Sequence, residues 1–362
     1  MKKKPELSKQ SPPNALQIEL VEGCSLNCTF CGVQGIRETR GGYKYMTKKI
    51  MKRLCKRLSK SMKIHKWNPR VELAVHGEPT MHPDLVWMVE QLGSLSPREL
   101  ILVTNGTGLA KNPNKSIDDL VEAGISSFCL DEYDGCDFAQ KVREGYTGKT
   151  PIFEYSAKSP ESFRGRNKKE AYIVIKEDVS HLTKAYDKLN THCGGGGNPG
   201  ETNPAIHKKC AKPFRELTIR WDGNVSLCCN DFRGIYKIGN ISDYDTLDDL
   251  WNVEAFHAAR QMLYHNSREF DPCRWCDALS TRVGLLPDKY GKKDIPEPDK
   301  RTARTISKAI RGQSYTLPVL RGWELSGGSC VGPGVDTADL ATQSIDVKNP
   351  PSKAARGKKR KK

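Results

Sequence analysis

The amino-acid sequence predicts an α/β fold, because short apolar runs alternate with segments of helical periodicity along residues 15–204. The strand candidates are separated by about one helix and its loops, a spacing typical of parallel strands that are covered by helices. Only five or six such units fit into this stretch, too few for a closed eight-stranded barrel. We therefore expect a partial (β/α) TIM-type barrel of five or six parallel strands.

Each expected element rests on a local pattern. Apolar runs predict strands at 16–21, 71–75, 100–104 and 125–130, and a fifth and perhaps sixth at 151–155 and 171–176. After the first strand, one apolar stripe repeats every four residues and predicts a basic amphipathic helix, through Ile50, Leu54, Leu58 and Met62. A second helix is expected after Pro83, with its apolar side formed by Leu85, Met88, Val89 and Leu92.

Changes in composition divide the chain into four parts. Residues 1–14 form a basic N-terminal arm, and residues 15–204 form the barrel domain, which ends in a glycine- and proline-rich linker. Residues 205–290 form a small cysteine-rich domain. Residues 291–362 carry sixteen Lys or Arg against seven Asp or Glu and are rich in Gly, Pro, Ser and Thr. We expect this last part to be a mostly disordered basic tail.

Composition also limits the compartment. The 362 residues contain no run of eighteen or more apolar residues, so we expect no membrane span. The charged start, MKKKPELSKQ, is not followed by the apolar stretch of a secretion signal. Thirteen cysteines, several in CxxC clusters, indicate metal binding in a reducing cytoplasm rather than disulfides.

The net charge of +16 is concentrated in the tail and in a second basic run at 48–66. Such surfaces attract nucleic acid, anionic substrates or acidic proteins, although a solvated helix face and a solubilising tail would have the same composition. Few aromatic residues alternate with these charges, so a nucleic-acid partner is possible but not favoured.

Three cysteines lie close together directly after the first expected strand: Cys24, Cys28 and Cys31, spaced C-x3-C-x2-C. A structural zinc or a closed iron–sulfur site needs four such ligands, and no fourth Cys or His follows nearby. A cubane 4Fe–4S cluster held by three thiolates would keep one iron open for another ligand. Zinc with a distant fourth ligand is the alternative.

With the aromatic Phe30 before the third cysteine, this spacing resembles the signature of the radical SAM superfamily. The sequence HGEPTMHPDL after the second strand is similar to that family's GGEP motif, with His76 in place of the usual first glycine. The resemblance implies that the open iron binds S-adenosylmethionine (SAM). It also implies SAM contacts by Phe30 near the adenine, by Gly77, Glu78 and Pro79, and by Asn105 in the TNG turn after the third strand.

A second cysteine set lies in the small domain: Cys210, Cys228, Cys273 and Cys276. Its pattern resembles the opening of the SPASM domain and, being shortened to four ligands, the Twitch domain that holds one auxiliary 4Fe–4S cluster. The gaps between these cysteines resemble those of the aminocyclitol dehydrogenases of the butirosin pathway. A four-thiolate zinc site would suit the same residues. Within the pair at 228–229, the resemblance selects Cys228 as the ligand and leaves Cys229 as a buried thiol.

The resemblance implies reductive cleavage of SAM to a 5′-deoxyadenosyl radical that takes hydrogen from substrate. A small polar metabolite would then be oxidised, and the auxiliary cluster would accept the electron left after hydrogen abstraction. A flavodoxin- or ferredoxin-type protein would be the external electron donor. Asp131 and Asp231 are general-base candidates by position alone. Two alternatives stay open: radical modification of a peptide or protein side chain, and a zinc-stapled nucleic-acid-binding protein.

Overall fold

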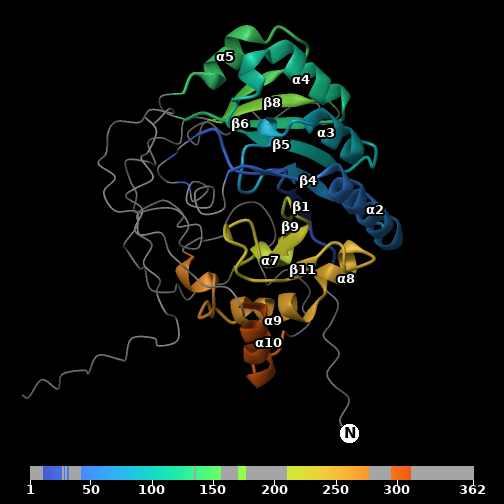
Figure 1. The fold of residues 1–362 in the computed structure, drawn as a ribbon, viewed down its shortest axis with the longest axis vertical. Helices are drawn as coiled ribbons and strands as arrows, with labels where there is room; N and C mark the ends of the chain where they lie inside the picture. The colour runs from blue at the N-terminus through green and yellow to red at the C-terminus, as the bar shows by residue number, and fades with distance from the viewer. Residues whose placement is uncertain are drawn as a thin grey trace, which may run out of the picture.

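The computed structural model describes residues 11–26, 28, 31, 42–133, 136–155, 170–176, 210–276 and 295–310. Within these residues, nine strands form one sheet in the order β11-β10-β9-β1-β4-β5-β6-β8-β7, and β2 pairs with β3 in a small separate ribbon (Figure 1). The neighbours from β9 to β7 are all parallel. The expectation of an α/β fold built on parallel strands is therefore confirmed.

The barrel part contributes six of these parallel strands. The two strands expected at 151–155 and 171–176 both form. The bounds of the six are β1 Ala15–Ile18, β4 Arg70–Leu73, β5 Glu99–Thr104, β6 Ser127–Asp131, β7 Ile152–Tyr155 and β8 Tyr172–Lys176. Strand β8 lies between β6 and β7, so β7 forms one edge of the sheet. The described sheet stays open, because its two ends, β11 and β7, do not pair with each other.

Side chains alternate between the two faces of the sheet. One face carries fully buried apolar residues in lateral register, among them Leu16 beside Val71 and Phe128 beside Ile173. These pack in one core with the helices. The opposite face of the central strands is polar at β1: Gln17 donates to Glu72 on β4 and accepts from Thr218 on β9. This polar side is suited to a ligand site above the strand ends.

The sheet does not stop at the predicted domain boundary. Strand β9 (Glu216–Ile219), the first strand after the linker, pairs in parallel with β1, with Ala15 opposite Glu216 and Ile18 opposite Ile219. The antiparallel strands β10 (Asn224–Ser226) and β11 (Gly239–Asn240) then extend the sheet outward. The cysteine-rich part is thus joined to the barrel part by main-chain hydrogen bonds, which local sequence patterns did not predict.

Four helices line one side of the barrel strands in Figure 1: α2 Lys48–His65, α3 Leu85–Gly93, α4 Pro113–Glu122 and α5 Phe138–Gly145. The short elements beside them are β2 Val21–Glu22, β3 Lys44–Tyr45, and the 3-10 turns η1 Pro79–Met81 and η2 Leu109–Lys111. Among the described residues, no helix is both long and apolar enough to cross a membrane.

Helix α2 forms where expected, but its buried stripe differs from the predicted one at both ends. Thr47 begins the helix by accepting a hydrogen bond from Ile50 N–H, and Lys66 ends it in the left-handed conformation. The buried residues are Met51, Leu54, Leu58 and Ser61, whereas the predicted Ile50 and Met62 are only partly buried. At the end of the helix a polar contact accounts for the difference, because Ser61 Oγ accepts at 2.8 Å from the N–H of Leu247, the first residue of α8 (Leu247–Trp251).

The cysteine-rich part also carries helices: α7 Lys212–Arg215, α8 Leu247–Trp251, α9 Glu254–Tyr264 and the 3-10 turn η6 Cys273–Trp275. A further helix, α10, spans Lys300–Ile310 and packs against α9 (Figure 1). The prediction of a mostly disordered tail from residue 291 is therefore wrong over this helix. Thr302, Ile306 and Ala309 are spaced to share one buried face, and the surrounding basic residues concealed that short pattern. Residues 311–362 lie outside the described part of the chain.

Candidate active site at the carboxyl edge of the sheet

The three clustered cysteines lie just beyond the carboxyl end of β1, the edge where parallel α/β folds place ligands. Cys24, Cys28 and Cys31 are partly exposed, and Cys31 N–H donates to Cys28 O at 3.0 Å. Tyr43 on the segment leading to β3 donates its hydroxyl to Cys24 O at 3.1 Å and so fixes the start of the loop. Phe30, the predicted adenine contact, lies outside the described residues.

The HGEP segment after β4 lies directly against this loop. Gly23 and Gly77 form a parallel β-bridge, and Glu78 N–H donates to Gly23 O at 2.9 Å. A Cβ atom on Gly77 would lie 2.0 Å from Val21 O and 2.6 Å from Gly23 O. Only glycine allows the two segments to approach this closely, which explains the residue in physical terms.

Glu78 is fully buried and joins the ends of β4 and β5. Its Oε1 accepts from the Thr80 and Thr104 hydroxyls, each at 2.6 Å, and from Thr80 N–H at 3.0 Å; its Oε2 accepts from Asn105 N–H at 2.8 Å. Burial raises the pKa of this carboxyl despite the donors that favour its charged form. Glu78 therefore fixes the TNG turn relative to the HGEP segment.

Asn105 connects that turn to the first cysteine. Its Nδ2 donates to Cys24 Sγ at 3.3 Å, while its Oδ1 accepts from Thr107 N–H at 2.9 Å. Leu26 N–H is a second donor to the same sulfur, at 3.4 Å. Donors aimed at a cysteine sulfur stabilise a thiolate ligand and are a feature of iron–sulfur sites.

The three thiols are close enough to influence one another. Burial raises the pKa of Cys28, and the neighbouring Cys31 and Cys24 raise it further. Neighbouring thiolates repel one another, and this repulsion is relieved when iron ions bind them. In the described part of the chain, no three Cys, His, Asp or Glu side chains converge on one metal ion. The fit to a cluster therefore rests on the donor set and its N–H···S contacts.

The second set, Cys210, Cys228, Cys273 and Cys276, is buried and reduced. Burial raises the pKa of Cys210 to about 11, with a further contribution from Cys228, and Cys273 responds in the same way to the other three. Asn230 Nδ2 points to Cys276 Sγ at 3.7 Å. The set has the four ligands that a closed site requires, and all four are buried. Cys229 instead accepts from Lys212 Nζ at 3.0 Å, consistent with a separate role.

The two general-base candidates have different surroundings. Asp131 lies at the end of β6, is partly exposed, and faces Lys176 Nζ at 3.2 Å. Asp231 is fully buried, and its two oxygens accept from Ile235 N–H at 2.9 Å and Tyr236 N–H at 3.1 Å. Burial raises the pKa of Asp231. Its arrangement is that of a turn-stabilising carboxyl group.

Tyr133 was missed by sequence reasoning. It follows β6 by two residues, and burial raises its pKa; the negative charge that Asp131 and the three clustered cysteines can carry raises it further. This phenol therefore lies near both Asp131 and the three-cysteine loop. Its only sequence signal was its position just after a strand end, which is the edge where site residues gather.

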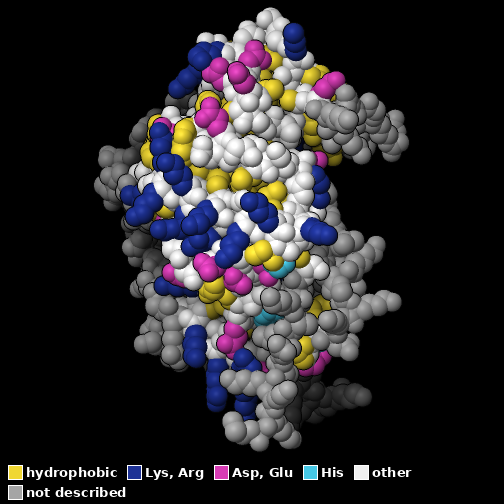
Figure 2. Space-filling view, turned by 90° about the vertical axis from the view of Figure 1, so that its right-hand side faces the viewer, with side chains coloured by type: hydrophobic (Ala, Val, Ile, Leu, Met, Phe, Trp, Pro, Cys, Tyr) yellow, Lys and Arg dark blue, Asp and Glu magenta, His cyan; other side chains and the backbone are white. Residues whose placement is uncertain are grey.

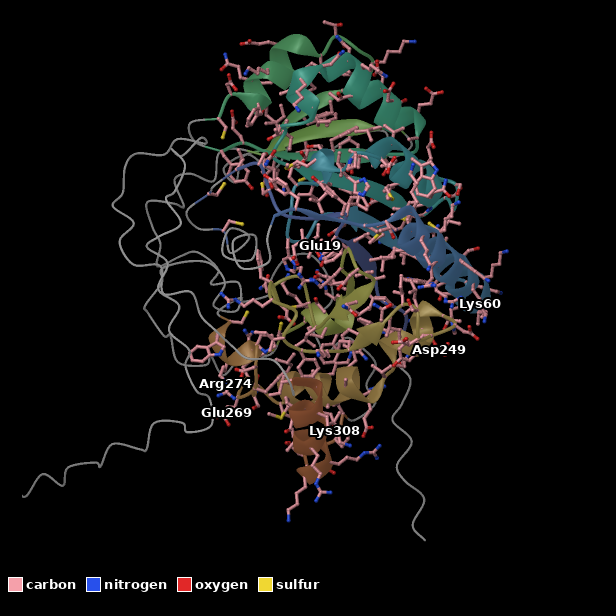
Figure 3. All side chains as sticks on the ribbon, viewed as in Figure 1. Glu19, Lys60, Asp249, Glu269, Arg274 and Lys308 are labelled. Carbon is pink, nitrogen blue, oxygen red and sulfur yellow. The ribbon has the colours of Figure 1, made fainter. Side chains whose placement is uncertain are left out.

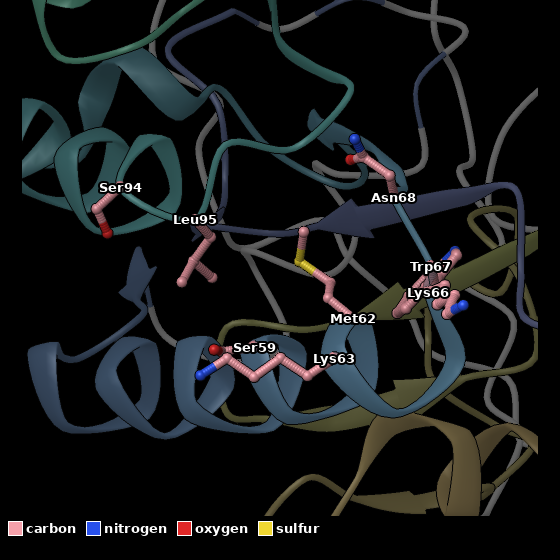
Figure 4. A pocket seen from close by; sticks show the side chains of 8 residues that line it. All are labelled: Ser59, Met62, Lys63, Lys66, Trp67, Asn68, Ser94 and Leu95. Carbon is pink, nitrogen blue, oxygen red and sulfur yellow. The ribbon is translucent and has the colours of Figure 1, made fainter.

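A surface hollow of about 420 Å³ lies elsewhere (Figure 4). Its lining residues come from the last turns of α2, from the segment that follows α2 and from the segment that follows α3, and they include Lys63, Trp67 and Leu95. Because these residues precede β4 and β5, the hollow opens at the amino edge of the sheet, opposite to the cysteines. Position therefore favours the carboxyl edge as the reactive side.

Comparison with known families agrees with this geometry. Residues 18–151 match the radical SAM superfamily, and residues 210–277 match SPASM, an iron–sulfur cluster-binding domain. The chain carries a radical SAM domain. This match implies a SAM-binding 4Fe–4S cluster in the first matched region, and the SPASM match implies auxiliary iron–sulfur binding in the second. The SPASM match favours an iron–sulfur cluster over the four-thiolate zinc site that the sequence left open for the second cysteine set.

Individual relatives of this radical SAM protein are distant. BtrN in complex with AdoMet and 2-DOIA has 22% sequence identity and a TM-score of 0.58, covering 77% of this chain and 98% of BtrN. An open conformation of BtrN has 20% identity and a TM-score of 0.50, covering 78% and 99%. A probable GTP 3′,8-cyclase of Methanothermobacter thermautotrophicus is 23% identical over 147 residues. That match covers 39% of this chain and 45%, less than half, of the relative.

Proposed function

We propose that this radical SAM protein oxidises a small polar metabolite and passes an electron from the reaction to an auxiliary cluster. The observation that carries the proposal is the different number of cysteines in the two sets. Three lie after the end of β1, and four buried ones lie in the SPASM region. When bound, the open cluster and SAM supply a 5′-deoxyadenosyl radical that can remove hydrogen from a C–H bond. The similarity in fold to BtrN supports this reading.

The residues at the carboxyl edge have distinct parts in the proposal. Cys24, Cys28 and Cys31 would hold the SAM-binding cluster, with the N–H donors of Asn105 and Leu26 stabilising the first thiolate. Gly77 permits the close approach of the HGEP segment, and Glu78 fixes the TNG turn. We propose that Pro79, which starts η1, holds the segment in its bend, and that Phe30 lies near the adenine.

Asp131 is the better general-base candidate. It is partly exposed at the strand edge, beside Tyr133, whereas both oxygens of Asp231 are engaged by backbone N–H groups. Lys176, paired with Asp131 at 3.2 Å, could orient a substrate hydroxyl beside the carboxylate. Asp131→Asn should then lower product formation while leaving SAM binding intact.

The external electron donor is proposed to be a flavodoxin- or ferredoxin-type protein that meets the basic face of α2. Figure 2 shows Lys and Arg side chains gathered across the side of the molecule to which α2 belongs. The exposed lysines of this helix include Lys49, Lys52, Lys56 and Lys60. The Nζ atom of Lys60 lies 3.7 Å from Asp245 Oδ2, a long ion pair. Such a face favours the approach of an acidic protein.

The test is anaerobic reconstitution followed by incubation with SAM, a strong reductant and candidate substrates carrying deuterium at single positions. We expect about eight irons per chain from two cubane clusters, and deuterium in 5′-deoxyadenosine with the right substrate. The panel includes cyclitols, sugars and peptides, so labelling from a peptide alone would favour side-chain modification and contradict the small-metabolite proposal.

Two variants separate the roles of the cysteine sets. Cys28→Ala should remove about half of the iron and all cleavage of SAM. Cys273→Ala should also remove about half of the iron but leave SAM cleavage in place while the oxidised product is lost. A Cys273→Ala variant that still forms the oxidised product at the wild-type rate would refute the auxiliary cluster as electron acceptor.

A further inference from the structure

A buried polar assembly joins the two cysteine sites, and neither site's ligands belong to it. It consists of Glu19, Glu22, His76 and Arg220, each at most 4% exposed. Glu19 and Glu22 lie between β1 and Cys24, His76 precedes Gly77, and Arg220 follows β9. Figure 3 shows Glu19 near the middle of the molecule, where the barrel strands meet the strands of the SPASM region. We name these four residues the buried bridge.

Glu19 is the centre of the buried bridge. Its Oε1 lies 2.9 Å from His76 Nδ1, an ion-pair distance when the ring carries both protons, and its Oε2 lies 3.4 Å from Arg220 Nε. Trp221 N–H also donates to Oε2, at 3.3 Å. Burial opposes the charged form of this carboxylate, but Arg220 and His76 outweigh it and lower its pKa. One carboxylate therefore contacts both the imidazole of His76 and the guanidinium of Arg220.

Both of those side chains reach the loop that carries the auxiliary cysteine Cys228. His76 Nε2 lies 2.7 Å from Cys229 O, and the ring must donate here because a carbonyl only accepts. Arg220 Nη1 donates to Phe232 O at 3.1 Å and to Asp231 O at 3.3 Å, and its Nη2 donates to Glu22. The loop is thus held at its beginning and at its end.

Phe232 completes the connection on the apolar side. It is buried, its ring centre lies 4.2 Å from that of His76, and the partly buried Cys24 and Cys31 pack against it. A residue four positions after an auxiliary ligand therefore contacts two of the three clustered cysteines. The imidazole of His76 touches Phe232 on one side and the Cys229 carbonyl on another, so a movement of this ring would reach both cysteine sites.

We propose that His76 is a positioning residue that couples the two cysteine sites, holding the loop 228–232 in one place against the loop that carries Cys24. Glycine at this position could make none of the three contacts, because it has neither a donor nor a ring. The expected consequence is that loss of the imidazole alters the surroundings of both clusters at once. This inference rests on the cluster content of the protein and does not depend on which substrate is oxidised.

The experiment uses the full chain, reconstituted anaerobically and reduced without substrate. Each variant is measured by the electron paramagnetic resonance spectrum of the SAM-binding cluster, with and without SAM, and by the midpoint potential of the auxiliary cluster. His76→Gly should change the spectrum of the SAM-binding cluster. It should also shift the ratio of reduced to oxidised auxiliary cluster about tenfold at a fixed solution potential, equivalent to ~59 mV for one electron. His76→Gln can still donate to Cys229 O and should recover most of the potential.

His82→Gln is the matched control. His82 is also a buried imidazole bonded to a backbone carbonyl, Met46 O at 2.9 Å, but its ring packs against Tyr45 and not against Phe232. It should lower stability while leaving both readouts at their wild-type values. Wild-type readouts in His76→Gly, or the same shifts in His82→Gln, would overturn the proposal.

A second variant covers the case in which His76→Gly fails to fold. Phe232→Leu keeps most of the apolar volume but removes the ring that contacts His76, Cys24 and Cys31. It should change the spectrum of the SAM-binding cluster, although the auxiliary ligands are untouched. If Phe232→Leu gives the wild-type spectrum of the SAM-binding cluster, the two sites are not coupled through this contact and the proposal is wrong.

Discussion

Replacing Gly77 by alanine tests the close approach of the HGEP segment to the cysteine loop. The new Cβ would lie 2.0 Å from Val21 O, about 1 Å closer than any Cβ tolerates, and the second obstacle, Gly23 O, is also backbone. Relief requires the two segments to separate, which breaks the Gly23–Gly77 bridge and the bond from Glu78 N–H to Gly23 O. Overpacking of this kind costs about 1–3 kcal/mol, and the lost hydrogen bond adds about 1 kcal/mol.

The assay compares Gly77→Ala with Gly93→Ala, in which the new Cβ would lie 2.4 Å from Ala123 O, where α3 meets the end of α4. Both variants should lower the midpoint of thermal unfolding by roughly 5–10 °C. Only Gly77→Ala should also lose SAM affinity, measured by equilibrium binding to the reconstituted protein, because only there does the loop that carries Cys24 move. Wild-type SAM affinity in Gly77→Ala, or an equal loss in Gly93→Ala, would refute this reasoning.

Three further predictions follow from single contacts. Asn105→Ala removes an N–H donor to sulfur and should make the potential of the SAM-binding cluster more negative in a redox titration; an unchanged potential would contradict the contact. Lys52→Glu with Lys56→Glu should slow reduction by flavodoxin and weaken its salt dependence, whereas Lys115→Glu on α4 should not. Burial lowers the pKa of His257 to about 4, so the stability that its neutral form contributes is complete above pH 6.5 and is lost as pH falls toward 4, by up to about 3 kcal/mol. Denaturation of His257→Gln across this range should show a flatter pH dependence, and an equally steep one would exclude His257 as the cause.

The sequence carried enough information for the fold class and the position of the reactive edge. Strand–helix alternation predicted the parallel sheet, and both uncertain strands, at 151–155 and 171–176, form. The three-cysteine spacing together with Gly77 and Glu78 indicated the family, because each motif follows a strand end and such ends meet in space. These are local signals, so one chain suffices to read them.

The remaining features depend on contacts between distant segments. His76 looked like a mere replacement in the HGEP motif, yet its carbonyl partner, Cys229 O, lies 153 positions away. The packing of Phe232 on Cys24 is equally remote in sequence. In α2, the buried face follows Ser61 because α8 docks there, which no periodicity within the helix shows. Helix α10 was hidden by its charge, since only three of its residues are buried.

The pairing of β9 with β1 has a consequence for how the chain is made. Strand β1 is synthesised about 200 residues before its second neighbour, which begins at Glu216, opposite Ala15. At typical synthesis rates of about 5–20 residues per second, one side of β1 waits roughly 10–40 s without its partner. During that interval the nascent protein presents an unpaired strand edge beside Cys24, a hazard for aggregation. Loading of iron and sulfur before residue 219 has been synthesised would therefore act on an incomplete sheet.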